Sequence, residues 1–266
     1  MTEPKIFWQD LTWREIQERL PKTQVVLVPT GSIEQHGPHL ALEHDSRSSI
    51  AVSEAAARKL YPRVLVAPSF FYGVSPHNVS ARLPGTLTLR SEIFIGLLMN
   101  IFESLRRFGV SRIVCVNGHG GNVEPLKIAV RRARDDLGFD AIAAPNYWDF
   151  IPTEEYARTL ERGEANPGHA GEFETSMALE LFPENVRKNK LPDPEYRDYL
   201  GAERITARTR IPLYADEWLK TGNSDDPKVA SAEKGRKLFR LAVNGLVAYL
   251  EDFVRFEPKY GWHKRI

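Results

Sequence analysis

The sequence predicts an α/β fold with a mostly parallel central sheet. Short runs of β-branched residues alternate along the chain with segments of helical periodicity, which is the pattern of βαβ units. The 266 residues, 42% of them hydrophobic, are enough to bury a large core. No linker of distinct composition divides them, so we expect a single domain that spans residues 1–266.

Strands are expected where β-branched and aliphatic residues cluster. The four runs are QVVLVP (24–29), RVLVAP (63–68), RIVCVN (112–117) and DAIAAP (140–145). Runs of this length and composition are typical of the buried strands of a parallel sheet.

Helices are expected between these runs and after the last of them. The helical patterns lie at 46–60, 91–108, about 122–137 and about 228–254. Ser46 and Ser91 each stand where a helix cap belongs, and Gly109 is placed to end the second helix. The segment from about 183 to 227 is rich in Pro, Asp and Arg without periodicity, so we expect loops there.

Composition excludes several classes of function. The chain carries 36 Lys and Arg against 35 Asp and Glu, so no global field favours nucleic acid or a membrane surface. The single cysteine, Cys115, excludes an internal disulfide framework and a four-thiolate zinc site. The amino-terminal residues lack the pattern of a signal peptide, and no apolar run reaches the length of a membrane span. We therefore expect a cytoplasmic protein that acts on a small molecule.

The loop after the first predicted strand concentrates potential metal ligands. The stretch GSIEQHGPHLALEHDS (31–46) contains Glu34, His36, His39, Glu43, His44 and Asp45. Glu34 and His36 are two residues apart, which points both side chains the same way in an extended segment. Asp45 stands directly before the expected helix, where a carboxylate can bridge two cations or simply cap the helix. Mixed carboxylate and imidazole ligands suit Zn²⁺, Mn²⁺ or Fe²⁺ better than Ca²⁺ or Mg²⁺.

A second group of ligands follows the third predicted strand. His119 lies in the glycine-rich turn NGHGGN (117–122), and the carboxyl ends of parallel strands meet at one edge of a sheet. Such a turn can also cradle a phosphate at a helix N-terminus. However, the Gly-Lys-Ser or Gly-Lys-Thr of a P-loop does not follow, so we interpret His119 as a metal ligand.

A third histidine-containing turn lies at PGHAGEFETS (167–176). His169 is flanked by small residues and is expected to be a further ligand or a proton shuttle. A helix that begins near Gly171 places Glu172 and Glu174 on different faces, so we expect only one of them to point into the site.

Four spaced motifs then identify a resemblance. VPTGSIEQHGPHLALEHD, LPGTLTL (83–89), VNGHGGN and HAGEFETS, in this order and spacing, resemble the creatininase family of amidohydrolases over roughly residues 5–182. The resemblance implies a three-layer α/β/α sandwich and a binuclear metal centre. It also implies a homo-oligomer, commonly a hexamer built as a trimer of dimers.

The resemblance also implies the ligands of the two divalent metals, which we expect to be Zn, Mn or Fe. Glu34, Asp45 and His119 match the ligands of one metal. His36 and the bridging Asp45 match ligands of the other. We expect Glu174 to complete that second set.

The family pattern further implies catalytic and substrate-binding residues. His169 matches the catalytic histidine that moves a proton between a metal-bound water and the leaving nitrogen, and Glu174 is expected to serve catalysis as well as metal binding. The residues expected to contact substrate are Trp148, Asn78, Gly120 and Gly121. Whether His44 or Glu172 joins the site stays open.

Two departures from the family pattern bear on the substrate. Creatininase itself carries a metal-binding glutamate where this chain has Gly121, and a second substrate-packing tryptophan where it has Ala165. Both changes argue against creatinine. We expect hydrolysis of a C–N bond in a small cyclic amide or a formamide.

Three alternatives remain at the level of sequence. The same centre could act on a cyclic keto-polyol such as a keto-inositol, either as a ring-opening hydrolase or as an isomerase, with Asn78, Asn146 and Asp149 binding hydroxyls. It could process a modified peptide precursor. A purely structural metal site is disfavoured because such sites are usually closed by Cys and His alone.

Overall fold

The sheet is parallel throughout its four strands. The computed structural model describes residues 3–161, 168–193 and 214–258. The strands are β1 (Val25–Thr30), β2 (Val64–Val66), β3 (Arg112–Asn117) and β4 (Ala141–Ala143). Their order is β2-β1-β3-β4, and each neighbouring pair is parallel. The predicted parallel α/β sheet is therefore confirmed, although β2 and β4 are shorter than their sequence runs.

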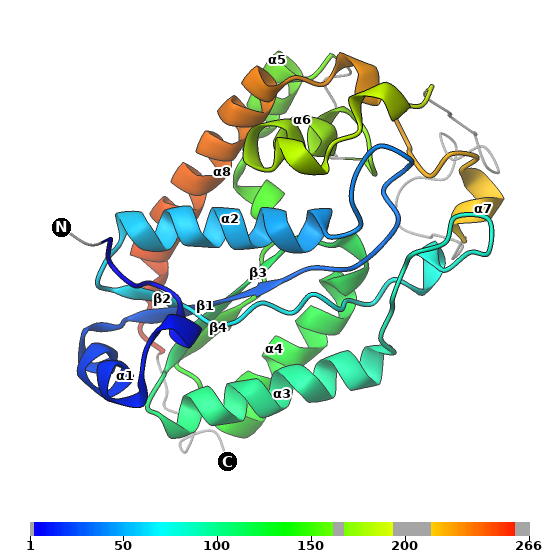
Figure 1. Cartoon of the computed structure of the whole chain (residues 1–266). Helices are drawn as coiled ribbons and strands as arrows, with labels where there is room; N and C mark the ends of the chain where they lie inside the picture. Colours follow the sequence, from blue (N-terminus) through cyan, green and yellow to red (C-terminus); the bar gives the residue numbers. More distant parts are fainter. Residues whose placement is uncertain (1–2, 162–167, 194–213, 259–266) are drawn as a thin grey trace.

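Helices cover both faces of this sheet, which gives three layers (Figure 1). One face packs against α2 (His44–Lys59), α6 (Glu172–Leu181) and α8 (Ala232–Phe253). The opposite face packs against α3 (Ser91–Arg107) and α4 (Val123–Leu137). The alternation of side chains along a strand explains the division, because each strand feeds both cores.

Strand β1 shows this alternation directly. Val25 and Leu27 belong to the core beneath α2, α6 and α8, whereas Val26 and Val28 belong to the core beneath α3 and α4. All four are fully buried. A one-residue slip of the strand would exchange the two sets, so the two-sided core fixes its position in the sheet.

Two helix starts differ from the sequence prediction. Helix α2 begins at His44, so Asp45 lies inside its first turn rather than before it. Ser46 does not cap this helix, because its hydroxyl donates to the Ser32 carbonyl at 3.3 Å. Helix α8 begins at Ala232, where the Ser231 hydroxyl accepts from the Lys234 amide.

Several short elements complete the described fold. The α-helices that the sequence did not predict are α1 (Trp13–Arg19), α5 (Thr153–Thr159) and α7 (Ala215–Trp218). The 3-10 helices η1 to η8 span Trp8–Asp10, Leu20–Lys22, Pro76–Asn78, Gly120–Asn122, Tyr147–Phe150, Pro183–Asn185, Lys188–Lys190 and Pro227–Val229. The predicted loop region 183–227 thus contains short helical turns, and its residues 194–213 lie outside the described part of the chain. Among the described helices, none is both long and apolar enough to cross a membrane.

Candidate metal centre

The carboxyl edge of the sheet gathers the predicted ligands into one place. Glu34 and His36 follow β1, His119 follows β3, and Asp45 lies in the first turn of α2. Close packing at Gly118 brings the last two together, because a Cβ at that position would lie 2.2 Å from the Asp45 carbonyl oxygen. Only glycine lets the end of β3 approach the first turn of α2 this closely.

Asp45 stands between two histidines. Its Oδ1 lies 3.0 Å from His36 Nε2, and its Oδ2 lies 2.9 Å from His119 Nδ1. All three side chains are 3% exposed or less. In spite of these short distances, neither His36 Nε2 nor Asp45 Oδ2 has a partner in the geometry of a hydrogen bond, and both atoms are buried. Buried polar atoms are normally satisfied, so these two fit a site that holds a cation.

Two further carboxylates lie near Asp45, one beside His119 and the other beside His36. Glu34 Oε1 lies 3.3 Å from His119 Nδ1. Glu174 Oε2 lies 3.6 Å from His36 Nε2, and the donor atoms of His36, Asp45 and Glu174 all lie within 4.8 Å of one another. The arrangement therefore offers a carboxylate and an imidazole on either side of one shared carboxylate.

Glu34 is oriented by side chains from another loop. The Ser75 hydroxyl and the Asn78 amide, the latter at 2.8 Å, both donate to Glu34 Oε2. Asn78 also accepts from Gln35 Nε2 at 3.1 Å. Glu34 therefore keeps Oε1 toward His119. Ser75 had no signal in the sequence, and the substrate contact expected of Asn78 stays a prediction.

The electrostatics of the centre show a concentration of buried negative charge. Burial opposes the charged form of His36, but Asp45, Glu174 and Glu34 outweigh it and raise the His36 pKa to about 10. Burial raises the pKa of Glu174 to about 8. The charged neighbours of these carboxylates in the described residues are histidines. A divalent cation can take the place of the protons that this cluster otherwise holds.

His169 lies beside the cluster with its ring held at one nitrogen. Its Nε2 lies 2.9 Å from the Gln35 carbonyl oxygen and 3.0 Å from Gln35 Nε2. Its Nδ1 lies 3.6 Å from Glu34 Oε1, and its ring centroid is 4.5 Å from that of His36. Burial and the neighbouring His36 lower the pKa of His169 to about 4.

The other histidines of the region have distinct surroundings. His39 contacts the Thr175 hydroxyl at 2.9 Å through Nε2. His44 is buried with its ring 5.1 Å from that of His36, and neither of its nitrogens has a hydrogen-bond partner. His77, which the sequence did not single out, stacks on His119, with the two ring centroids 5.9 Å apart.

Of the two glutamates on α6, only Glu174 faces the cluster, as predicted. Glu172 is also buried, but its carboxylate accepts from Lys234 Nζ at 2.5 Å and from the Glu161 amide at 3.0 Å. Glu172 therefore belongs to a separate ion pair between α6 and α8.

Gly121 stands where a side chain has no room. A Cβ there would lie 2.1 Å from the Val74 carbonyl oxygen and 2.5 Å from His119 Nε2. The backbone of this chain thus excludes a glutamate at that position. Gly120, by contrast, is exposed, and a Cβ added there would have no neighbouring atom within 4 Å.

Trp148 is the remaining residue that was predicted to contact the substrate. Trp148 is partly buried against the core and meets Tyr147 edge-on at 5.2 Å. Its role at the substrate stays a prediction. Ala165 lies outside the described residues.

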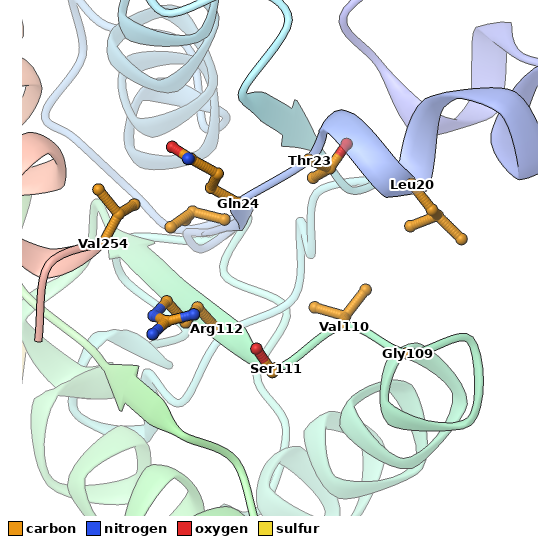
Figure 2. Close-up of a pocket in the computed structure, with 9 residues that line it drawn as sticks. Leu20, Thr23, Gln24, Gly109, Val110, Ser111, Arg112 and Val254 are labelled. Atoms are coloured by element: carbon orange, nitrogen blue, oxygen red, sulfur yellow. The ribbon is translucent and has the colours of Figure 1, made fainter. Parts of the chain in front are cut away.

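A cavity lies at the opposite edge of the sheet from the clustered histidines and carboxylates. The cavity has a volume of about 210 Å³. Its lining includes Thr23, Gln24, Ser111 and Arg112, which lie near the amino ends of β1 and β3 (Figure 2). No carboxylate or imidazole is among its described lining residues. The clustered carboxylates and imidazoles lie at the carboxyl edge instead.

Comparison with known proteins shows the family of the chain. The family model for creatininase (creatinine amidohydrolase) matches residues 9–250. The chain belongs to the creatininase family. It is a metal-dependent hydrolytic enzyme with the fold of that family.

Its relatives within the family differ in what they act on. Creatinine amidohydrolase of Pseudomonas putida is 30% identical, covering 93% of this chain and 97% of the relative. A mycofactocin precursor peptide peptidase of Mycobacterium ulcerans is 34% identical, covering 86% of each chain. A 3-dehydro-scyllo-inosose hydrolase of Thermotoga maritima is 27% identical, covering 94% of this chain and 83% of the relative.

Solved creatininases share the same architecture. The manganese form of creatininase superposes with a TM-score of 0.80 at 27% identity, covering 94% of this chain and 99% of that one. A mutant creatininase of Zn-Zn type gives a TM-score of 0.79 at the same identity and coverage. Both names describe those proteins as metal-bound.

Proposed function

We propose that this protein is a binuclear metal-dependent amidohydrolase that cleaves a C–N bond of a small cyclic amide or a formamide. The observation that carries the proposal is the position of Asp45, whose two oxygens face His36 and His119 separately. A carboxylate in this arrangement is suited to bridge two cations.

In this proposal, one metal would bind on each side of Asp45. Glu34 and His119 would hold one, and His36 and Glu174 the other. Carboxylate and imidazole donors suit zinc, manganese or iron. When bound, such a pair of ions activates a water and polarises the carbonyl of the substrate.

His169 would move the proton in this reaction. Its Nε2 donates to the Gln35 carbonyl in the tautomer that leaves the Nδ1 lone pair facing the centre. From there Nδ1 can accept a proton during attack on the carbonyl and deliver it to the leaving nitrogen. The partly buried position of His169, with its side chain 17% exposed, limits exchange of that proton with bulk water.

The structure bears on the choice between substrates. Creatinine stays disfavoured, because Gly121 cannot carry the glutamate that creatininase itself has there. The side chains that favoured a keto-polyol are engaged within the protein: Asn78 contacts Glu34 and Gln35, and Asn146 donates to Asp149. The 34% identity to a peptide peptidase makes a modified peptide the second candidate substrate.

A parallel substrate screen tests this proposal. The protein, purified with its native metals, is assayed against cyclic amides, formamides, keto-inositols and a short modified peptide, with Asp45→Ala as the blank. Turnover of an amide or formamide that the variant lacks supports the proposal. Turnover of a keto-inositol or peptide alone contradicts the C–N specificity for small substrates.

The assembly and location are proposed along with the function. We expect a homo-oligomer, a hexamer formed as a trimer of dimers, which acts in the cytoplasm without nucleic-acid or membrane partners. Light scattering after size exclusion measures the mass of the assembly against the 30.2 kDa chain.

A further inference from the structure

The loop region after α6 returns to the metal centre at residues 221–225, the sequence TGNSD, which we call the TGNSD segment. Asn223 at its middle is fully buried and braces it from inside. Its Nδ2 donates to the Asp225 carbonyl at 2.9 Å and to the Asp193 carbonyl at 3.3 Å. Its Oδ1 accepts from the Thr221 hydroxyl at 2.5 Å. These hydrogen bonds hold the conformation of the segment independently of its contacts with the site.

Ser224 of this segment forms hydrogen bonds with both the amide and the carbonyl of His169. The His169 amide donates to the Ser224 hydroxyl at 2.7 Å, and the Ser224 amide donates to the His169 carbonyl at 2.8 Å. These two residues are 55 positions apart in sequence. No sheet or helix of the described chain includes His169, so these bonds take the place of a ladder.

The backbone around His169 needs such support. Gly168 and Ala170 on either side have φ angles of +68° and +50°. The left-handed conformation is unfavourable for alanine, so surrounding contacts must impose it. Directly after this turn, Asp225 Oδ1 accepts from the Glu172 amide at 2.6 Å. The TGNSD segment thus anchors the turn at His169 and again at the start of α6.

The same segment also touches the partner of the His169 ring. Gly222 has a φ of +83°, and a Cβ there would lie 2.0 Å from Gln35 Oε1. Gln35 in turn contacts His169 Nε2 through both its carbonyl oxygen and its side-chain amide. One short segment therefore supports the histidine from its backbone and from its ring.

We propose that the TGNSD segment is a clamp that positions His169, with Ser224 as the principal positioning residue. The inference rests on the proposed function, in which His169 moves the proton. The clamp holds Nδ1 at 3.6 Å from Glu34 Oε1. A displacement of about 1 Å in such a group can cost about 100-fold in rate.

Substitutions at Ser224 test the clamp. Ser224→Ala removes the acceptor for the His169 amide, whereas Ser224→Thr keeps a hydroxyl. Asp226→Ala is the matched control, because Asp226 caps the next turn by accepting from the Lys228 amide at 2.9 Å. We expect Ser224→Ala to lower kcat about 10- to 100-fold. KM and metal content should change less than about twofold, and Ser224→Thr should restore most of the rate.

Hydrogen exchange provides a readout that needs no substrate. In the intact protein, the peptide that contains the His169 amide should exchange about tenfold faster in Ser224→Ala than in the wild type or in Asp226→Ala. Unchanged exchange would overturn the clamp, as would an unchanged kcat or a loss of rate that accompanies loss of metal. If the wild type turns over no tested substrate, the proposed function fails while the exchange experiment still decides the clamp.

Discussion

Replacement of Glu174 by glutamine should remove one metal and leave the other. Glu174 Oε2 lies 3.6 Å from His36 Nε2 and accepts from the Ala170 amide at 2.5 Å. Glutamine keeps the size of the side chain and an oxygen that can accept from Ala170. Glutamine has no proton to release, whereas Glu174, with a pKa of about 8, becomes negatively charged when a cation displaces its proton beside His36. The opposite side of Asp45, with Glu34, is left intact.

The structure sets the size of the expected effect. The donor atoms of His36, Asp45 and Glu174 lie within 4.8 Å of one another, so the lost charge is close to any cation they hold. A carboxylate and a cation about 4 Å apart interact by on the order of 4 kcal/mol for each unit of cation charge at an effective dielectric constant of about 20, so this figure is a minimum for a divalent ion. At about 1.4 kcal/mol for each factor of ten, this corresponds to at least about 1,000-fold weaker binding of that metal.

Elemental analysis after dialysis against a weak chelator measures the outcome. We expect the metal content of Glu174→Gln to fall to half that of the wild type. Glu180→Gln is the control, since Glu180 lies on the same helix and pairs with Arg236 at the surface. If Glu174→Gln bound as much metal as the wild type, with equal affinity at both sites, the assignment of Glu174 as a ligand would be refuted.

Three further substitutions test separate parts of the structure. His169→Ala should keep the metals but lower kcat about 100- to 10,000-fold, the usual contribution of a proton-transfer group; loss of metal instead would make His169 a ligand. Gly121→Glu should destabilise the protein by about 1–3 kcal/mol in urea unfolding, because its Cβ meets a backbone carbonyl at 2.1 Å, whereas Gly120→Ala should change stability by less than about 0.5 kcal/mol. Lys234→Met should lower the free energy of unfolding by about 3 kcal/mol, because it leaves the buried Glu172 carboxylate unpaired. Adding Glu172→Gln should recover part of this stability. Equal stability of Lys234→Met and the wild type would contradict the prediction.

The strands and long helices could be predicted because their hydrophobic periodicity extends over the whole element. Val25 and Leu27 alternate with Val26 and Val28, and that pattern needs no tertiary information. The short helices α1 and α5 have seven residues each, which is too few for periodicity to show. The start of α2 was misplaced because the Ser46 hydroxyl donates to the Ser32 carbonyl, at the beginning of the loop between β1 and α2, instead of capping the helix.

The convergence of the predicted ligands could also be foreseen from the sequence, because it follows from the topology. Loops after parallel strands share one edge, so Glu34, His36 and His119 had to meet near the first turn of α2. The supporting side chains could not be found in this way. Ser75 reaches Glu34 across 41 positions and Ser224 reaches His169 across 55, and neither contact leaves a local pattern in the sequence.

Gly121 shows a different limit of sequence reasoning. The missing side chain was visible in the sequence, but its cause was not. The Val74 carbonyl occupies the place that a Cβ would take, and this contact depends on how two loops pack. The sequence could therefore only suggest that a predicted ligand comes from elsewhere. The structure adds that Glu174 Oε2 lies 3.6 Å from His36 Nε2.

The central claim is that Asp45 bridges two metals, and anomalous diffraction from crystals of the manganese-loaded protein tests it most directly. We predict two anomalous peaks in each chain, one between Asp45 and His119 and one between Asp45 and His36. Both peaks should disappear in Asp45→Ala. A single peak in the wild type, or two peaks of which only one contacts Asp45, would contradict the account.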